Sequence, residues 1–200
     1  AILFAAILGI CGFATLITLT NPLTTALGAV GLISYASIYT YAKRHTVHST
    51  LIGTVSGAIP PVAGYTAATN HLDASAWIIF GILISWQMVH FYAISIYRRK
   101  EYAKAKIPLM SVIYGVWVTK IQMVIYGAVF LLAIISLAKF GYAGLFYLAV
   151  MGPLALWWLL ITISGLSADD DEAWGKKTFF ISLIITLAFS FCLGINAWVP

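Results

Sequence analysis

The sequence is dominated by apolar runs that are long enough to cross a lipid bilayer as helices. A spanning helix needs about 20 mostly apolar residues. Such runs occupy residues 1–20, 23–42, 51–69, 74–97, 116–138, 142–165 and 178–199. Because a bilayer core offers the backbone no hydrogen bonds, only helices and closed barrels can span it, and these runs are too continuously apolar for barrel strands. The predicted fold is an all-α, polytopic transmembrane helical bundle that forms a single domain over residues 1–200.

The low charge of the chain excludes several classes of protein. Charged residues make up 8% of the sequence and hydrophobic residues 62%, whereas soluble domains carry roughly 25% charged residues. A soluble protein of this size would need more charge to cover its surface. The composition therefore excludes a soluble enzyme, a disordered chain and a nucleic-acid-binding module, and it makes the lipid bilayer the first expected partner.

Basic residues gather in alternate connections between the predicted helices. The long polar connections 43–50, 98–115 and 166–177 hold two, five and two lysines and arginines, whereas the short connections hold only Lys139. Such an asymmetry marks the cytoplasmic side of a membrane protein. We therefore expect a multi-pass protein of the inner membrane whose long connections and first residue face the cytoplasm, with the C-terminus on the opposite side.

The third run, 51–69, is unusual because it contains both glycines and a proline pair. Pro60 and Pro61 remove backbone donors and can bend a helix, while Gly53 and Gly57 allow another helix to approach closely. Two interpretations follow from these residues. The run is either a kinked packing helix or a helix bent around a central cavity.

The fourth run carries polar residues at helical spacing. Gln87, His90, Ile94, Tyr97 and Glu101 share one face if the helix continues to residue 101. His90 would lie seven residues inside Tyr97, roughly 10 Å at 1.5 Å per residue. A histidine at that depth needs an internal partner or a wet cavity, so it is either a satisfied interhelical hydrogen bond or part of a cavity lining.

Two basic clusters are candidates for binding an anion. Tyr39 and Lys43 lie one helical turn apart and Arg44 follows, although a snorkelling lysine beside an interfacial tyrosine would show the same pattern. Glu101 is the only carboxylate in the most basic connection, among Arg98, Arg99, Lys100, Lys104 and Lys106. Cations suit the oxygens of a diphosphate, and a carboxylate can hold Mg²⁺ against them.

Several short motifs occur in one order along the chain. They are Tyr39-xxx-Lys43-Arg44, Leu51-Ile52-Gly53, Ser56-Gly57-Ala58, Pro60-Pro61, Gly64-Tyr65, Trp86-Gln87-Met88, His90-Phe91-Tyr92-Ala93-Ile94, Glu101-Tyr102 and Ile107-Pro108. Together they resemble the protohaem IX farnesyltransferase (haem O synthase) family, a branch of the UbiA-type intramembrane prenyltransferases. The resemblance covers essentially the whole chain, and it is the combination of motifs that makes it specific.

The resemblance implies a fold and an activity. The family has nine helices around a cavity that opens to the cytoplasm, and the seven runs correspond to its third to ninth helices. It transfers a farnesyl group from farnesyl diphosphate to a vinyl group of protohaem IX, giving haem O and diphosphate. Two acidic motifs hold the diphosphate through Mg²⁺. Glu101 matches the second motif, where relatives usually have aspartate, and we expect the first motif upstream of Ala1.

The resemblance also implies roles for individual residues. Glu101, Lys43 and Tyr39 are the expected catalytic residues, and Glu101 is the expected metal ligand. The expected diphosphate-binding cations are Lys43, Arg44, Arg98 and Lys104. The expected cavity or haem-contacting residues are His90, Gln87, Tyr92 and Tyr97, with an interhelical hydrogen bond as the alternative for His90. Tyr39, Tyr92 and Tyr97 are the nearest aromatic rings that could shelter an allylic cation.

The expected partners are farnesyl diphosphate, protohaem IX and the bilayer, with haem A synthase or the oxidase assembly machinery as protein partners and no nucleic acid. Two alternative functions remain open from the sequence. One is a UbiA-type prenyltransferase that acts on a quinone precursor. The other is a membrane transporter, in which broken helices and buried histidines are common.

Overall fold

The computed structural model describes residues 2–196, and these fold into helices joined by short connections. The elements follow in the order α1 (Ile2–Leu19), α2 (Pro22–Ile33), η1 (Ser34–Tyr39), α3 (Thr40–His45), α4 (Ser49–Thr69), α5 (Ala74–Tyr97), α6 (Arg99–Lys104), α7 (Met110–Ile113), α8 (Gly115–Lys139), α9 (Leu145–Ser164), η2 (Gly165–Ser167) and α10 (Asp171–Ile195). No strand occurs among these described residues. The all-helical fold expected from the sequence is confirmed.

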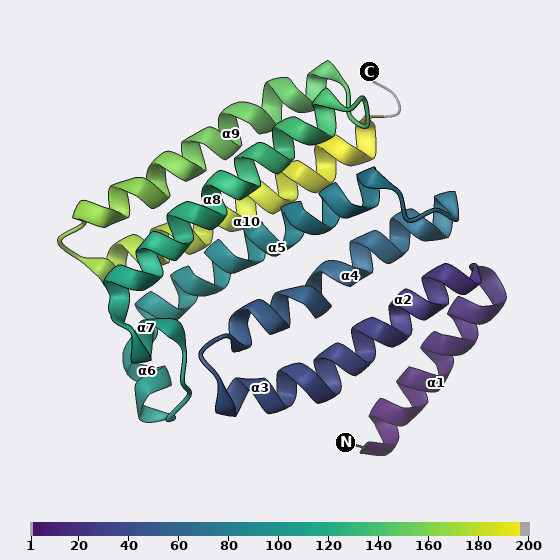
Figure 1. Ribbon diagram of the computed structural model, residues 1–200, viewed down its shortest axis with the longest axis horizontal. Helices are drawn as coiled ribbons and strands as arrows, with labels where there is room; N and C mark the ends of the chain where they lie inside the picture. Colours follow the sequence, from purple (N-terminus) through teal and green to yellow (C-terminus); the bar gives the residue numbers. More distant parts are fainter. Residues whose placement is uncertain (1, 197–200) are drawn as a thin grey trace.

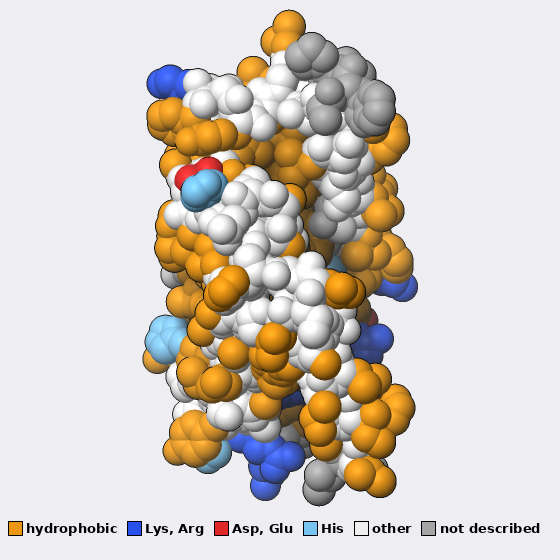
Figure 2. Space-filling view, turned by 90° about the vertical axis from the view of Figure 1, so that its right-hand side faces the viewer, with side chains coloured by type: hydrophobic (Ala, Val, Ile, Leu, Met, Phe, Trp, Pro, Cys, Tyr) orange, Lys and Arg blue, Asp and Glu red, His pale blue; other side chains and the backbone are white. Residues whose placement is uncertain are grey.

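Five of the helical segments are long and apolar enough to cross a membrane. They are Pro22–His45, Ala74–Tyr97, Gly115–Lys139, Leu145–Ser167 and Asp171–Ile195, and Leu3–Leu19 is a shorter apolar helix. Hydrophobic side chains predominate on the face shown in Figure 2, as expected for a surface that meets lipid. The protein is therefore a multi-pass membrane protein. The count of seven spans stays a prediction, because neither α1 nor α4 is among the five segments.

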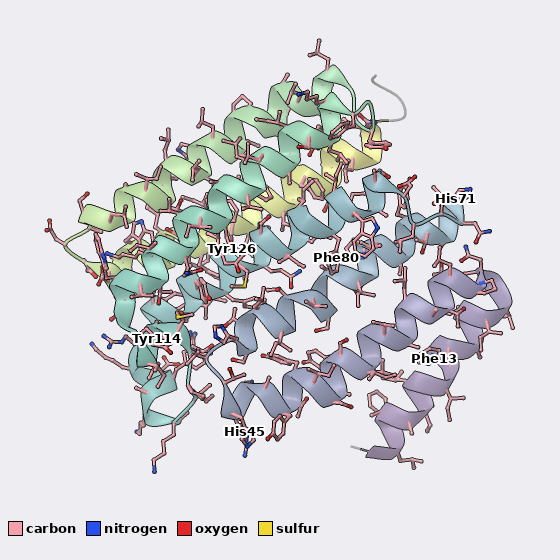
Figure 3. All side chains as sticks on the ribbon, viewed as in Figure 1. Phe13, His45, His71, Phe80, Tyr114 and Tyr126 are labelled. Carbon is pink, nitrogen blue, oxygen red and sulfur yellow. The ribbon has the colours of Figure 1, made fainter. Side chains whose placement is uncertain are left out.

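Successive long helices run in opposite directions, so the connections alternate between two ends of the bundle (Figure 1). His45 and Tyr114, which border the first two long connections, lie at one end, and His71 of a short connection lies at the other (Figure 3). The 43–50, 98–115 and 166–177 connections thus share an end. This grouping is the one that the distribution of basic residues predicted, whereas its cytoplasmic location stays a prediction.

Helix α5 is the centre of the bundle. It packs against α4, α8 and α10, while α9 packs on α8 and α10, and α2 packs on α4. The main core lies between α5, α8, α9 and α10 and is filled by large side chains that include Phe130, Tyr147 and Trp158. The hydroxyls of Thr24 and Thr66, 2.9 Å apart, link α2 to α4. The space between α2, α4 and α5 lies outside this main core, so a binding site can form there.

Helix α10 begins earlier than the apolar run predicted. It starts at Asp171 rather than at residue 178, because the Asp170 side chain accepts hydrogen bonds from the backbone N–H groups of Glu172 and Ala173. Such a cap satisfies otherwise unpaired donors, and acidic residues in the first turn interact favourably with the helix dipole. Asp170, Asp171 and Glu172 therefore form the start of this helix. The predicted end at residue 199 lies outside the described residues.

Candidate active site

A cavity of about 880 Å³ lies between α2, α4 and α5. Helix α4 lines it from Ser49 to Ala67, which are 18 residues apart, so this wall is roughly 27 Å long at 1.5 Å per residue. Lys43 and Tyr102 line the end at the long connections, and Thr20 lines the cavity where α1 ends. Of the two sequence interpretations of residues 51–69, cavity lining is confirmed. The helix continues through the proline pair as one element, Ser49–Thr69.

The polar end of the cavity is built on a π-helical turn. The turn η1 contains Tyr35 and Tyr39, whose stacked rings lie 5.5 Å apart and both line the cavity. Such turns occur frequently at functional sites. The Lys43 ammonium lies 6.0 Å from the centroid of the Tyr39 ring. Gly53 allows this approach to α4, because a Cβ there would lie 2.8 Å from the Tyr39 ring.

Glu101 does not share a helical face with His90, because α5 ends at Tyr97. The backbone of Arg98 leaves the helical conformation, with φ −104° and ψ 20°, and Glu101 belongs to the separate helix α6. The Glu101 side chain is 68% exposed. It forms an ion pair with Arg98, in which the distance from Arg98 Nη1 to Glu101 Oε2 is 3.0 Å. A hydrogen bond to the Tyr97 hydroxyl and the charge of Glu101 raise the pKa of Arg98 above its usual value. Glu101 therefore stands at the basic end of the bundle but does not line the cavity.

The remaining expected diphosphate ligands lie near this end without lining the cavity. Arg44 and Lys104 are exposed, at the end of α3 and of α6 respectively. Of the expected cations, Lys43 alone borders the cavity in the described part of the chain. The structure thus brings Lys43 and Tyr39 together at the cavity and leaves the other expected cations exposed, without lining it.

Two of the expected cavity tyrosines lie elsewhere. The Tyr92 side chain is buried, and its ring lies 6.5 Å from that of Tyr126 on α8. The Tyr97 ring packs 5.8 Å from Phe179 on α10. Neither residue lines a described cavity. The sequence did not indicate Tyr35 and Tyr102, which do line the main cavity, because their neighbours across the cavity are remote in the chain.

A second cavity, of about 590 Å³, lies between α4, α5 and α10 and is bordered by His90. His90 Nδ1 lies 2.7 Å from the Ser182 hydroxyl, and the imidazole stacks on Trp86 with centroids 5.0 Å apart. Both sequence interpretations of His90 are therefore correct. It makes an interhelical hydrogen bond, and it also borders a cavity.

Gln87 lies on the wall between the two cavities. Gln87, Gly57 and Phe91 line both of them. A Cβ at Gly57 would lie 2.2 Å from Gln87 Oε1, so only glycine allows the amide to sit against α4 in this way. Gln87 is 6% exposed. Its expected place in a cavity lining is the one that the structure gives it.

The described residues offer little to a metal ion on their own. No group of three or more histidine, cysteine, aspartate or glutamate side chains is close enough to bind one in the described part of the chain. Mg²⁺ commonly takes one or two carboxylates and completes its shell with phosphate oxygens and water. A lone Glu101 beside a basic cluster fits that pattern as one ligand of a metal–diphosphate complex.

One buried charge was missed by the sequence analysis. Lys120 is 4% exposed inside α8. Its ammonium pairs with Asp171 at the start of α10 and lies 5.4 Å from the centroid of the Trp174 ring. A lysine within an apolar run is itself a signal of a buried partner, but the partner lies 51 positions away in sequence (171 − 120).

Comparisons with known proteins place the chain in a family. The UbiA prenyltransferase family model matches residues 1–184. The chain is 40% identical over 201 residues to the protoheme IX farnesyltransferase of Enterobacter sp. (strain 638), covering 100% of this chain and 68% of the relative. It is 41% identical over the same shares to the protoheme IX farnesyltransferases of Citrobacter koseri and Salmonella typhi. No solved structure matches it. The chain belongs to the UbiA prenyltransferase family.

Proposed function

We propose that the protein transfers a farnesyl group from farnesyl diphosphate to a vinyl group of protohaem IX, giving haem O and diphosphate. Family membership and the printed names of the relatives support the reaction class. The observation that carries the proposal is the main cavity, which is long, lined mostly by apolar residues and bordered by Lys43 at the end where the basic connections lie. A prenyl chain suits such a cavity, and its diphosphate suits that end.

The residues at the basic end neutralise the leaving group in this proposal. Lys43, Arg44, Arg98 and Lys104 contact the diphosphate oxygens, and preorganised positive charge of this kind lowers the barrier to breaking the allylic C–O bond. Glu101 would hold a Mg²⁺ ion, which would supply further charge neutralisation at the diphosphate. The rings of Tyr39 and Tyr35 lie next to Lys43 and offer negative faces to an allylic cation.

The next step joins the farnesyl group to the porphyrin inside the cavity. The vinyl carbon of the porphyrin forms the new C–C bond to the farnesyl carbon, and water adds to the resulting cation with loss of a proton. The apolar lining keeps water away from the allylic cation until that bond forms. Tyr97 and Tyr92 have no direct part in this scheme, because both lie away from the cavities.

The orientation of the protein in the membrane sets where diphosphate is released and where haem O goes. The basic connections lie on the cytoplasmic side of the inner membrane, so diphosphate is bound and released on that side. Haem O would pass to haem A synthase or to the oxidase assembly machinery. An enzyme acting on a quinone precursor is the alternative, and it predicts prenylation of a phenolic ring without any requirement for haem.

The substitution Glu101→Gln tests the proposal, because it keeps the size of the side chain and removes the charge. Membranes containing equal amounts of the complete protein are given farnesyl diphosphate, protohaem and Mg²⁺, and haem O is measured by chromatography and mass. We expect at least a tenfold loss, which is about 1.4 kcal/mol of transition-state stabilisation. Glu101→Asp should retain activity, because aspartate can also bind the metal.

Glu172→Gln is the matched control, because Glu172 is also exposed at this end and pairs with Lys100 at 3.8 Å. It should have little effect. If Glu101 is only a surface partner of Arg98, then Glu101→Gln should cost no more than about 0–1 kcal/mol, as exposed ion pairs do. Equal activity of the two glutamine variants would exclude the metal-binding role, and absence of haem O formation by the wild type would exclude the proposed reaction.

A further inference from the structure

The proposed function places the prenyl diphosphate in the main cavity and leaves the second cavity for a separate substrate. We infer that it is the iron-porphyrin site and that His90 Nε2 is the ligand to the haem iron. The inference rests on the proposed function for the identity of the porphyrin. It depends on three features of the described residues: the tautomer of His90, the packing of its ring, and the wall shared by the two cavities.

The hydrogen bonds around Ser182 assign the tautomer of His90. The Ser182 hydroxyl has one proton and donates it to the carbonyl oxygen of Phe179. With the hydroxyl proton placed there, the 2.7 Å contact between His90 Nδ1 and Ser182 Oγ is a hydrogen bond donated by Nδ1–H. In the neutral imidazole this leaves the lone pair on Nε2. Histidine ligands of metals are usually oriented in this way, by donating the other ring N–H to a hydrogen-bond acceptor.

The packing of the ring leaves only one edge of His90 for a ligand. Trp86 stacks on the imidazole at an interplanar angle of 26°, and the Phe179 ring lies 4.9 Å from it. The Trp86 indole N–H donates to the backbone oxygen of Ser182 at 2.8 Å, which holds the stacking partner in place. Nε2 has no hydrogen-bond partner among the described residues, and His90 borders the cavity. A fixed ring with a free, unprotonated nitrogen at a cavity is suited to coordination.

The second cavity has the size and character that a porphyrin needs. Its volume of about 590 Å³ falls within the roughly 300–1,000 Å³ of pockets that enclose a small organic ligand. Apolar side chains form most of its wall, including Ile79, Leu83 and Phe189. Lysine and arginine are absent from the described lining, so the cavity suits the apolar ring of a porphyrin better than a diphosphate and offers no cation to the two propionates.

The wall between the cavities is where the two substrates would meet. Gly57 and Gln87 border both cavities. Gly57 lies four residues from Gly53, roughly 6 Å along α4, and the ring of Tyr39 packs against Gly53. A vinyl substituent of a porphyrin bound at His90 can therefore face the main cavity one helical turn from its aromatic end. The Gln87 amide fills the space beside Gly57, so it is the side chain that a vinyl group would contact on this wall.

The test measures porphyrin binding without any prenyl diphosphate. Wild-type protein in lipid nanodiscs is titrated with ferric protohaem, followed by Soret absorption and electron paramagnetic resonance, and with metal-free protoporphyrin IX, followed by fluorescence. We expect His90→Ala to weaken haem binding at least tenfold and to remove the histidine signature, while metal-free porphyrin binds nearly as before. Added imidazole should restore the signature. His71→Ala, in an exposed connection at the other end, is the matched control and should bind haem normally.

Two further variants keep the inference testable if His90→Ala does not fold. Thr186→Trp fills the second cavity without changing the partners of His90, and it should weaken both porphyrins at least tenfold. Ser182→Ala removes the acceptor for Nδ1–H but retains the backbone oxygen that Trp86 uses, and it should weaken haem binding by roughly tenfold, as loss of a supporting hydrogen bond does at metal sites.

The outcomes separate this inference from the proposed reaction. Unchanged haem affinity and spectra in His90→Ala and in Thr186→Trp would overturn the site, as would a wild type that binds no haem. If haem O forms while His90 gives no spectral signature, the reaction stands and the iron ligand is wrong. If haem binds through His90 but no farnesyl group is transferred, the site stands and the proposed reaction is wrong.

Discussion

Lys120 and Asp171 form an ion pair whose two partners differ in burial. Replacing Asp171 should lower the free energy of unfolding more than replacing Lys120. The Lys120 side chain is 5% exposed, whereas that of Asp171 is 42% exposed. Removing one partner of a fully buried pair costs about 3–5 kcal/mol, because the other charge stays buried without a partner, and an exposed pair is worth about 0–1 kcal/mol. For Asp171→Asn, which leaves a buried ammonium beside Trp174, we expect a loss of about 2 kcal/mol in the free energy of unfolding.

The opposite substitution removes the buried charge itself. After Lys120→Met the chain packs a thioether in α8, and the Asp171 carboxylate can still reach solvent, so we expect a cost of about 0–1 kcal/mol. A change of 1 kcal/mol shifts the melting temperature of a chain of this size by roughly 2–4 °C. Asp171→Asn should therefore melt about 4–8 °C below the wild type. The double variant should be close to Lys120→Met alone.

Thermal unfolding of the protein in matched nanodiscs, followed by circular dichroism and by tryptophan fluorescence, measures both changes. Asp169→Asn is the control, because this aspartate precedes α10 and makes no ion pair within residues 2–196. The reasoning from burial would be refuted if Lys120→Met destabilised the protein as much as Asp171→Asn, or if neither variant differed from the control.

Three other predictions concern the cavities, the short connection between α4 and α5, and the topology. Gly57→Ala should displace the Gln87 amide and lower haem O formation severalfold without unfolding. Gly81→Ala is the control, because a Cβ there meets no atom within 4 Å and Gly81 lines neither cavity, so it should leave activity nearly unchanged in the same assay. A hydrogen bond from Tyr65 and others from the start of α5 hold the pKa of Asp73 below its usual value. The contribution of Asp73 to stability is therefore complete above the ordinary aspartate pKa and is lost as the pH falls through the lowered value, and in Tyr65→Phe a carboxyl titration by NMR should show that loss at higher pH. A reporter fused after residue 200 and one inserted in the 98–115 connection should be accessible from opposite sides of the membrane, and accessibility from one side would contradict the seven-span count.

Much of the helical framework could be predicted from the sequence, because lipid imposes a simple rule on helix length and composition. The run 74–97 matches α5, Ala74–Tyr97, at both ends. The capping of α5 by Asp73 explains that agreement, since its side chain accepts from two backbone N–H groups of the first turn. Where the capping residue lies several residues before the apolar run, as Asp170 does for α10, a prediction from hydropathy starts the helix too late.

The candidate site could be predicted only in part. Spacing along one helix indicated Gln87 and His90 correctly as cavity residues, but the same spacing extended too far and placed Glu101 on their face. The helix ends at Tyr97, and the Arg98 backbone that follows has non-helical dihedral angles. The sequence does not reveal this change of conformation. The Ser182 partner of His90 lies 92 positions away and needs the packing of α10 against α5 to be known.

The unequal distribution of charge around the two cavities has a kinetic consequence. A lysine borders one cavity at the end where the basic connections lie, and the other has no described cationic lining. Long-range attraction should speed the encounter of a multiply charged anion with the first cavity, and this steering weakens as added salt shortens the Debye length from about 30 Å at 0.01 M to about 10 Å at 0.1 M. The second-order rate constant for the diphosphate substrate should therefore fall with ionic strength while turnover at saturation stays constant. Capture of the flat apolar co-substrate should depend instead on its partition into the bilayer, so the two reactants would arrive by routes that respond to different variables.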